Sequence, residues 1–480
     1  MFDTPDRRLR EPYLTTPRIS LTNDLAAPGI KVSAASCLQD YYKLSVEWSD
    51  CLLSEPAEGA SGFFKFGPHV TCYGKCKSGA VSRQVDADLH DALSDVHLAD
   101  CAVYLPFDPG DLIQNLRRER YQEALRPLWE QIVGRKVPQK TYYVLRHLLP
   151  FRLRRALQRA YFSGWVEMHF PSWPVDFTVD SFHEELLKLA MKARGIQKLP
   201  FIWFWPNGAS SCLIMTHDVE GSRGRDLTAQ LMDIDESYGF RASFQVIPEG
   251  RYEVSASYVN EIRNRGFEFN LHDLNHDGHL YHEKDEFLRR AKRINEYTRQ
   301  FNSRGFRAGS MHRDTDWYNA FEFSYDMSIP SVAHLEPRRG GCCTVMPFFI
   351  GPIVELPLTT IQDYSLFNIL NNYSIDFWKK QVAIIREKNG LISFITHPDY
   401  LVADRERHVY SSLLNYLREV VAQENIWAPL PRDVDSWWRA RSDMRLVRSG
   451  GGWAIHGEGS ERARIAYAVL TDDRLGYELQ

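Results

Sequence analysis

CLIMTHDVE, residues 212–220, is an apolar run that ends in two acids. Its first four residues are typical of a buried β-strand, and side chains two positions apart on an extended backbone point the same way. Asp218 and Glu220 can therefore face one spot at the end of the strand, where one could bind a metal while the other takes a proton. Because Gly221 follows, the same Asp-x-Glu pattern also fits a solvated turn.

A second polar cluster, HDLNHDGH at residues 272–279, follows a strand-like segment. Four of the 16 histidines of the chain fall within residues 272–282. His272 and His276 are four positions apart, a spacing that places both imidazoles on one side of a helical turn, as in two-histidine zinc sites. The cluster is a candidate metal site. Its acids and its glycine also fit a polar surface loop.

A third strand-like run, LISFITHP at residues 391–398, ends in His397 and Pro398. A lone histidine at such a position is also typical of a structural side chain. However, the carboxyl ends of parallel strands open on one face of an α/β sheet or barrel, where such folds build their active sites. Three polar clusters that each follow a strand therefore predict one site, with the groups of a metal-assisted amide or ester hydrolase.

These motifs resemble the polysaccharide deacetylases of carbohydrate esterase family 4, which have the NodB-homology fold. The resemblance covers residues 206–430. In that family one acid of the first strand motif is the general base, and the second acid holds a divalent metal with two histidines of a His-x-x-x-His motif. The resemblance thus implies Asp218 as the base and Glu220, His272 and His276 as ligands of a divalent ion, expected to be Zn²⁺.

Three further roles follow from the same resemblance. Arg307, in FRAGS, resembles the arginine that orients the base, and His397 resembles the late histidine that acts as general acid. Asp326, in YDMSI, is the expected orienting partner of His397. The sequence departs from the common pattern because Val219 separates acids that are usually adjacent aspartates, and because Ala308 replaces the usual proline after Arg307.

The organisation of the chain follows from its alternating patterns. Apolar strands at 211–217, 241–247, 267–271 and 391–396 alternate with helical patterns at 225–238, 255–265, 284–302 and 375–388, which favours a parallel α/β arrangement. The family implies a distorted, incomplete (β/α) barrel. The glycine- and proline-broken segment 340–360 indicates a loop or short hairpin near the site. We expect an irregular arm (1–30), an accessory α/β domain (31–205), the catalytic domain (206–430) and a small β-rich C-terminal appendage (431–480).

Composition and charge indicate which partners and which cellular compartment to expect. The 58 basic and 62 acidic residues nearly balance, so no global field indicates nucleic acid binding. No apolar leader or run of about 20 apolar residues is visible. The eight cysteines are scattered, which favours reduced thiols in the cytoplasm. Cys72 and Cys76 have the spacing of half a zinc site, but no second half lies near them.

One basic segment raises the question of membrane contact. Residues 151–162 place Arg152, Arg154, Arg155 and Arg159 among apolar residues, a pattern that could lie on an anionic membrane surface. A helix with solvated or paired arginines fits the same pattern. Peripheral binding to the inner face of the membrane would suit a lipid-linked glycan as substrate.

The resulting prediction is a metal-dependent hydrolase that removes N-acetyl groups from amino sugars of a polysaccharide or lipid-linked precursor, as in exopolysaccharide biosynthesis. It would use metal-activated water, Asp218 as base and His397 as acid. The expected partner is a glycan with N-acetylated sugars, and no nucleic acid. Two alternatives stay open: a deformylase or amidase of the same fold with another substrate, and a catalytically silent glycan-binding homologue.

Overall fold

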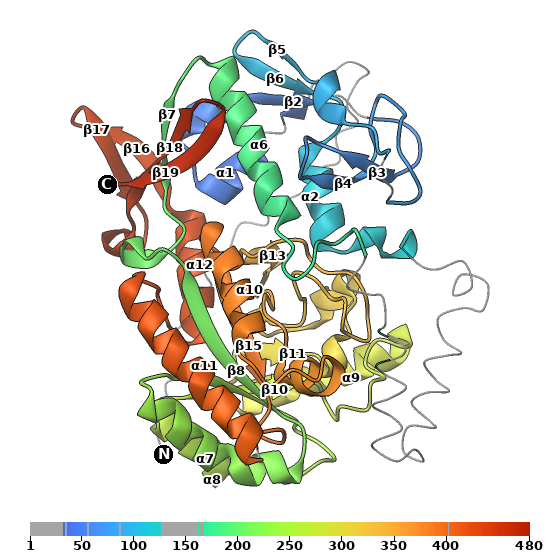
Figure 1. Cartoon of the computed structure of the whole chain (residues 1–480), viewed down its shortest axis with the longest axis vertical. Coiled ribbons are helices and arrows are strands. Elements are labelled where there is room, and N and C mark those ends of the chain that lie inside the picture. Colours follow the sequence, from blue (N-terminus) through green and yellow to red (C-terminus); the bar gives the residue numbers. More distant parts are fainter. Residues whose placement is uncertain are drawn as a thin grey trace, which may run out of the picture.

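The barrel is built on an eight-stranded sheet, shown in Figure 1. The computed structural model describes residues 32–33, 36–54, 57–85, 88–125, 159, 162, 168–401 and 403–480. The strand order is β13-β14-β12-β11-β10-β9-β8-β15. In chain order the strands are β8 (Cys212–Val219), β9 (Ser243–Val246), β10 (Glu268–His272), β11 (Gly305–Arg307), β12 (Tyr325–Asp326), β13 (Phe348–Ile350), β14 (Ile353–Glu355) and β15 (Leu391–Thr396).

The barrel strands read as continuous apolar runs because both faces of the sheet are covered. Every residue of β8, β10 and β15 is buried, which is the pattern of parallel strands packed under helices. Helix α7 packs against β8 and α10 against β15. The helices of this part are α7 (Ser222–Ser237), α8 (Ala256–Asn264), α9 (Lys284–Gln300), α10 (Asp376–Glu387) and α11 (Asp404–Gln423).

The sheet is curled but not closed, since β13 and β15 stand at opposite ends of the strand order. All neighbouring strands run parallel except β13 and β14, which form an antiparallel hairpin. The segment 340–360 therefore contains the expected hairpin, but β14 also pairs with β12 and so extends the barrel sheet. The predicted α/β class with a distorted (β/α) barrel of the NodB-homology type is confirmed.

The N-terminal region has its own mixed sheet, of order β1-β2-β6-β5, and a separate hairpin. Figure 1 shows it above the barrel in blue and cyan. The sheet strands are β1 (Val32–Ser33), β2 (Leu52–Ser54), β5 (His97–Ala99) and β6 (Ala102–Leu105). The hairpin is β3 (Gly62–Lys65) and β4 (Thr71–Gly74), and the helices are α1 (Ser36–Tyr42), α2 (Pro109–Arg117) and α6 (Thr178–Ala193).

The C-terminal strands do not stand apart from this region. Strand β18 (Ile465–Thr471) pairs with β19 (Arg474–Leu479) and also with β7 (Lys198–Ile202), and one hydrophobic core joins these strands to the N-terminal region. Strands β16 (Arg445–Ser449) and β17 (Gly452–His456) form a separate hairpin. The β-rich pattern expected from residue 431 begins only at β16, because Pro431–Asp443 is the helix α12. The division of the chain into these four segments stays a prediction.

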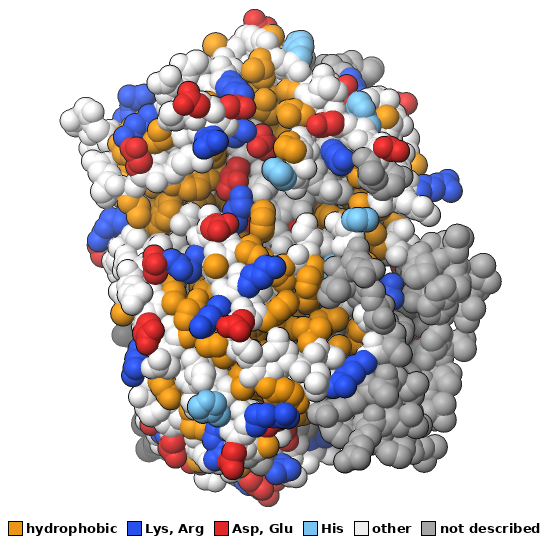
Figure 2. Space-filling model, in the orientation of Figure 1, with side chains coloured by type: hydrophobic (Ala, Val, Ile, Leu, Met, Phe, Trp, Pro, Cys, Tyr) orange, Lys and Arg blue, Asp and Glu red, His pale blue; other side chains and the backbone are white. Residues whose placement is uncertain are grey.

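Two predicted segments lie outside the residues that the structure describes: the arm at 1–30, and 151–162 apart from Arg159 and Phe162. Arg159 donates hydrogen bonds to the Asn368 carbonyl at 3.0 Å and the Asn371 side chain at 3.2 Å. None of the described helices combines the length and apolar composition of a membrane span. On the face in Figure 2, acidic and basic side chains are interspersed.

Candidate active site

The carboxyl ends of the barrel strands bring the predicted site residues together. Asp218 is the next-to-last residue of β8, His272 ends β10, Arg307 ends β11, and His397 directly follows β15. The strand register aligns these ends, since His272 is the pairing partner of Arg307 and His217 that of Thr396. The parallel sheet thus converts four positions far apart in sequence into one cluster.

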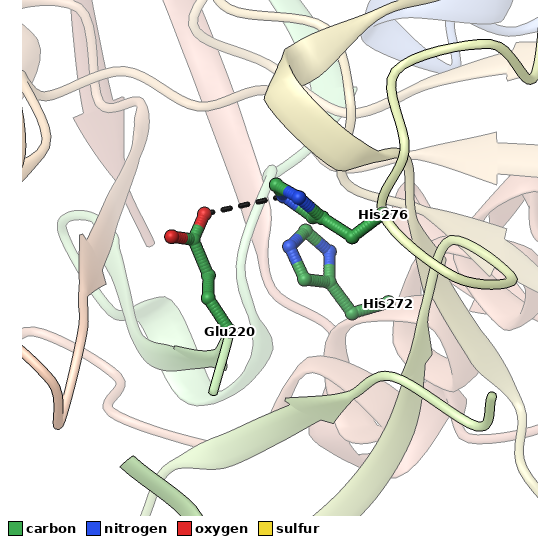
Figure 3. Close-up of side chains that lie close together, drawn as sticks. All are labelled: Glu220, His272 and His276. Atoms are coloured by element: carbon green, nitrogen blue, oxygen red, sulfur yellow. Dashed lines mark ion pairs between the residues drawn. The ribbon is translucent and has the colours of Figure 1, made fainter. Parts of the chain in front are cut away.

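Three side chains form a group that could hold a metal ion. One ligand atom from each of Glu220, His272 and His276 lies within 4.8 Å of the other two (Figure 3). The Nε2 atom of His276 lies 3.2 Å from Oε1 of Glu220. The two imidazole centroids are 4.8 Å apart. Both histidines are buried, whereas the Glu220 side chain is partly exposed.

His272 is held in the tautomer that a metal ligand requires. Its Nδ1 lies 3.1 Å from the carbonyl oxygen of Arg307, which can only accept, so Nδ1 carries the proton. Burial lowers the pKa of His272 to about 4, so the ring is neutral at pH 7. Its Nε2 is buried without a hydrogen-bond partner. A neutral imidazole with one nitrogen tied to a carbonyl and the other free is the usual form of a ligating histidine.

The two histidines do not meet across a helical turn, as the sequence spacing suggested. The chain leaves β10 in a loop in which Asp273 and His276 both have left-handed backbone conformations, with φ of 58° and 54°. The backbone N–H of Asp273 donates to the Arg307 carbonyl at 2.8 Å, which ties the loop to β11. His276 is thus placed by two unusual backbone conformations rather than by helical periodicity.

Asp218 is paired with Arg307 at the floor of the site. Arg307 Nη1 donates to Asp218 Oδ1 at 2.6 Å, and Arg307 also holds Thr216 Oγ1 and the Met327 carbonyl at 2.9 Å. Burial opposes ionisation of Asp218, but the charge of Arg307, followed by His272, outweighs it and lowers the pKa of the carboxyl. Asp218 is therefore an anion whose second oxygen, 3.8 Å from Nε2 of His272, faces the ligand group.

His397 also borders the ligand group, with Nε2 3.8 Å from Oε1 of Glu220. Its Nδ1 donates to Asp363 Oδ1 at 2.6 Å, and its backbone N–H donates to Asp363 Oδ2 at 2.8 Å. Burial acts to lower the pKa of His397, but the charge of Asp363 and the nearby site acids raise it to about 10. His397 therefore carries a proton at neutral pH, with Nε2–H directed to the site.

The predicted orienting partner of His397 was wrong. Asp326 is fully buried, and its oxygens accept from Tyr318 and Ser328, both at 2.7 Å. It also shares a buried hydrogen bond with Glu355, and burial raises the pKa of both carboxyl groups. Asp326 thus belongs to a buried polar network with Tyr318, Ser328 and Glu355. Asp363 holds His397 instead, because the connection between β14 and β15 carries it to the end of β15.

Two residues that the sequence reasoning missed support Glu220. Asp399 accepts from the backbone N–H groups of Glu220 at 3.3 Å and Gly224 at 3.0 Å, which fixes the turn into α7. Tyr400 donates its hydroxyl to Glu220 Oε2 at 3.2 Å. Both directly follow the His397-Pro398 pair. A polar residue after a strand-end histidine was the available signal for them.

The residues present fit a divalent metal ion. Zinc in proteins takes histidine nitrogens and carboxylate oxygens, and three protein ligands are the usual set where a position stays open for substrate. Nε2 of His272 is buried without a hydrogen-bond partner, a costly state that a ligated ion would relieve, and Nε2 of His276 is directed at the Glu220 carboxylate, which would share that ion. Among the residues that the structure describes, this is the one group of three or more metal-ligating side chains whose ligand atoms lie within 4.8 Å of one another. Its occupant stays a prediction.

Comparison with known proteins gives matches among solved structures only. No protein-family model matches the sequence, and a search of curated proteins finds no match. Thirty structures match, many of them polysaccharide or peptidoglycan deacetylases. A Mycobacterium smegmatis protein assigned as a polysaccharide deacetylase matches with 16% identity and a TM-score of 0.39, over 52% of this chain and 96% of its own.

Two further matches have similar extents. PuuE allantoinase matches with 11% identity and a TM-score of 0.39, over 49% of this chain and 92% of its own. The peptidoglycan deacetylase PdaC from Bacillus subtilis matches with 10% identity and a TM-score of 0.32, over 49% of this chain and 95% of its own. Each match thus covers about half of this chain.

Proposed function

We propose that this chain is a metal-dependent hydrolase that removes acetyl groups from N-acetylated amino sugars of a glycan. One observation carries the proposal: a three-ligand group, in which Nε2 of His272 has no hydrogen-bond partner, lies next to a carboxylate held ionised and a histidine held protonated. An amide hydrolase needs both groups, because a proton must leave the attacking water and another must reach the departing amine. The acetamide of an amino sugar is the substrate class that the motif resemblance implies.

The residues would divide the reaction as follows. Glu220, His272 and His276 would hold the divalent ion, with Zn²⁺ the expected one. The chemistry that such an ion supplies is Lewis-acid activation of a carbonyl group and of water. Asp218 would accept the proton from the attacking water, since Arg307 holds it ionised and aimed at the ligand group. His397 would give its Nε2 proton to the departing amine nitrogen.

The supporting residues explain how the roles stay separate. Asp363 binds His397 through both carboxylate oxygens, so the imidazole keeps its proton on the side that faces the site. Arg307 binds Asp218 and prevents that carboxyl from taking up a proton before substrate arrives. Two titratable groups with pKa values pushed apart are the arrangement that acid–base catalysis requires. The glycan partner, the exopolysaccharide setting and the cytoplasmic location stay predictions.

Elemental mass spectrometry of the purified chain tests the ligand group directly. We expect about one divalent ion per chain, and loss of that ion in His272→Ala and in His276→Ala. His279→Ala, in the same loop but outside the ligand group, is the matched control and should keep the ion. A wild-type chain that takes up no ion after incubation with zinc would overturn the proposal.

Acetate release from N-acetylated oligosaccharides then tests the reaction. The proposal expects acetate to appear only with the metal-loaded wild type. Formate from N-formyl sugars, without acetate from N-acetyl sugars, would make the chain a deformylase of the same fold. Tight glycan binding with no product from any acylated sugar would make it a silent binder.

A further inference from the structure

A cavity of about 610 Å³ lies where the N-terminal region meets the barrel. It is lined by residues on or next to α1, α2 and α6 of that region, by Pro347 and the first two residues of β13, and by residues of α12. None of its lining residues belongs to the candidate active site. Its volume is in the range that proteins use to bind small molecules, about 300–1,000 Å³.

Arg441 of α12 brings an unneutralised positive charge to this cavity. Its side chain is only 2% exposed. Nε donates to the Trp203 carbonyl at 2.9 Å, and Nη2 donates to the carbonyls of Tyr41 and Ile202 at 2.9 and 2.8 Å. Carbonyl oxygens thus accept from three of the five N–H groups of the guanidinium but leave its charge uncompensated, and burial lowers the pKa of Arg441 to about 9.

Arg117, at the end of α2, faces the same cavity. Its guanidinium carbon lies 5.1 Å from the centroid of the Phe348 ring, and its Nε is buried without a hydrogen-bond partner. Lys43 is the third base of the lining, and Asp40 is its one acid. Among the residues that the structure describes, no carboxylate forms an ion pair with Arg117 or Arg441.

A second acid behind the wall does not remove this excess. Asp180 interacts with Arg117 at longer range, but its oxygens already accept from Tyr41, Thr344 and the Val345 N–H at 3.1, 2.7 and 2.9 Å. Burial raises the pKa of Asp180 to about 6, so this carboxylate takes up a proton at a higher pH than an ordinary aspartate does. Three bases therefore line the cavity beside one acid, Asp40, whereas Asp180 and Asp443 act on Arg117 and Lys43 from outside the lining. Aromatic rings form much of the wall.

We propose that this cavity binds a phosphorylated small molecule of nucleotide size. Its phosphate groups would pair with Arg117 and Arg441, since guanidinium groups match the geometry of phosphate oxygens and are weakly hydrated. The uncharged part would lie against the rings of Tyr41, Phe348 and Trp438, which line the same cavity and suit a planar base or a sugar face. The site is separate from the candidate active site and does not depend on the proposed function.

Isothermal titration of the full chain with uridine diphosphate and with inorganic pyrophosphate tests the proposal. We expect uridine diphosphate to bind, and to bind more tightly than pyrophosphate because only the nucleotide reaches the rings. Arg117→Gln should weaken uridine diphosphate by about 30-fold, the loss expected for a charge-assisted pair of about 2 kcal/mol. This change leaves the carbonyl contacts of Arg441 in place, so the fold is retained, as thermal unfolding will check.

Arg118→Gln is the matched control. Arg118 follows Arg117 in the chain and pairs with Asp316 at 3.2 Å instead of lining the cavity, so this variant should bind as the wild type does. Absence of uridine diphosphate binding, or equal binding by Arg117→Gln and wild type, would overturn the proposal. So would sedimentation with phosphatidic acid vesicles by a chain that ignores uridine diphosphate, since the ligand would then be a lipid headgroup.

Discussion

Acids follow strands in both the barrel and the N-terminal region, but they have different partners. Asp108, shortly after β6, accepts hydrogen bonds at Oδ1 from the N–H groups of Gly110 and Asp111 at 2.8 and 3.1 Å, and so caps α2. Asp218, at the end of β8, is instead bound to a buried arginine and lies 3.8 Å from Nε2 of His272. A strand-end acid is therefore no sign of a site unless the local backbone leaves it without a capping role.

Buried histidines show the same contrast. His183 in α6 has Nδ1 2.7 Å from the Val179 carbonyl one turn earlier, and its ring stacks on Tyr41 with centroids 4.0 Å apart. His272 also uses Nδ1 for a carbonyl, but its Nε2 meets no hydrogen-bond partner, and Nε2 of His276 lies 3.2 Å from the Glu220 carboxylate. Two histidine nitrogens and a carboxylate oxygen that converge within 4.8 Å distinguish the barrel site from ordinary histidine burial.

Replacing Asp218 gives the largest expected effect on this contrast. Asp218→Asn keeps the shape but removes proton acceptance, so we expect acetate release to fall by about a thousandfold, within the range for loss of a general base. Metal content should stay near wild type, because Asp218 is not one of the three ligands. Acetate release and elemental analysis of the same preparation measure both quantities. Wild-type turnover by Asp218→Asn would assign the base to another residue.

Breaking the buried ion pair that joins the two regions should cause a large loss in the free energy of unfolding. Glu119, after α2, and Arg313 of the barrel part are bonded through both carboxylate oxygens with side chains 1% and 0% exposed. Glu119 also accepts from the Gly341 N–H at 2.6 Å. Glu119→Gln leaves Arg313 buried without its anion, so we expect a loss of about 3–5 kcal/mol in the free energy of unfolding, measured with urea.

An exposed pair between the same regions is the control for that prediction. Arg118 and Asp316 lie 3.2 Å apart, and the Asp316 side chain is 67% exposed. Asp316→Asn should cost at most about 1 kcal/mol because solvent screens the pair. Equal losses in Glu119→Gln and Asp316→Asn would show that the buried pair does not couple the two regions.

Gly309 tests how tightly the histidine loop is placed. A Cβ at this position would lie 2.5 Å from Oδ2 of Asp273 and 2.9 Å from Cδ2 of His276, so one of the two must move. We expect Gly309→Ala to weaken zinc binding by about tenfold or more, as for other changes next to a ligand. Gly476→Ala, where no atom lies within 4 Å of the added carbon, is the matched control. A competition assay with a chelator measures both affinities.

Local sequence predicted the elements of the barrel well because each parallel strand is a continuous apolar run. The same pattern placed Asp218, His272 and His397 at strand ends, whereas Arg307 followed only from the motif resemblance, and the parallel sheet brought all four together. The spacing of His272 and His276 predicted their proximity for the wrong reason. Asp273 and His276 are of residue types that adopt the left-handed conformation more often than most, but this conformation is too uncommon outside glycine for the sequence to predict the loop.

Long-range pairing was the part that the sequence could not reveal. Asp363 reaches His397 only because the segment after β14 returns beside β15. In the sequence, Asp326 of the YDMSI motif was an equally plausible partner for His397. Strand β18 pairs with β7, although more than half of the sequence separates them. The C-terminal segment predicted to be an appendage therefore shares its core with the N-terminal region. Neither contact follows from periodicity, which is set by local burial alone.

The smallest expected effect comes from removing the N-cap of helix α2. Asp108→Ala removes the acceptor for two N–H groups at the start of the helix, so we expect a loss of about 1 kcal/mol in the free energy of unfolding. Metal content and acetate release should not change, because Asp108 touches no residue of the ligand group. Asp108→Asn keeps a side-chain acceptor and should recover most of the stability, as urea unfolding will show. Loss of bound metal in Asp108→Ala would mean that acids at strand ends in the two regions are energetically coupled, and the contrast between cap and site would fail.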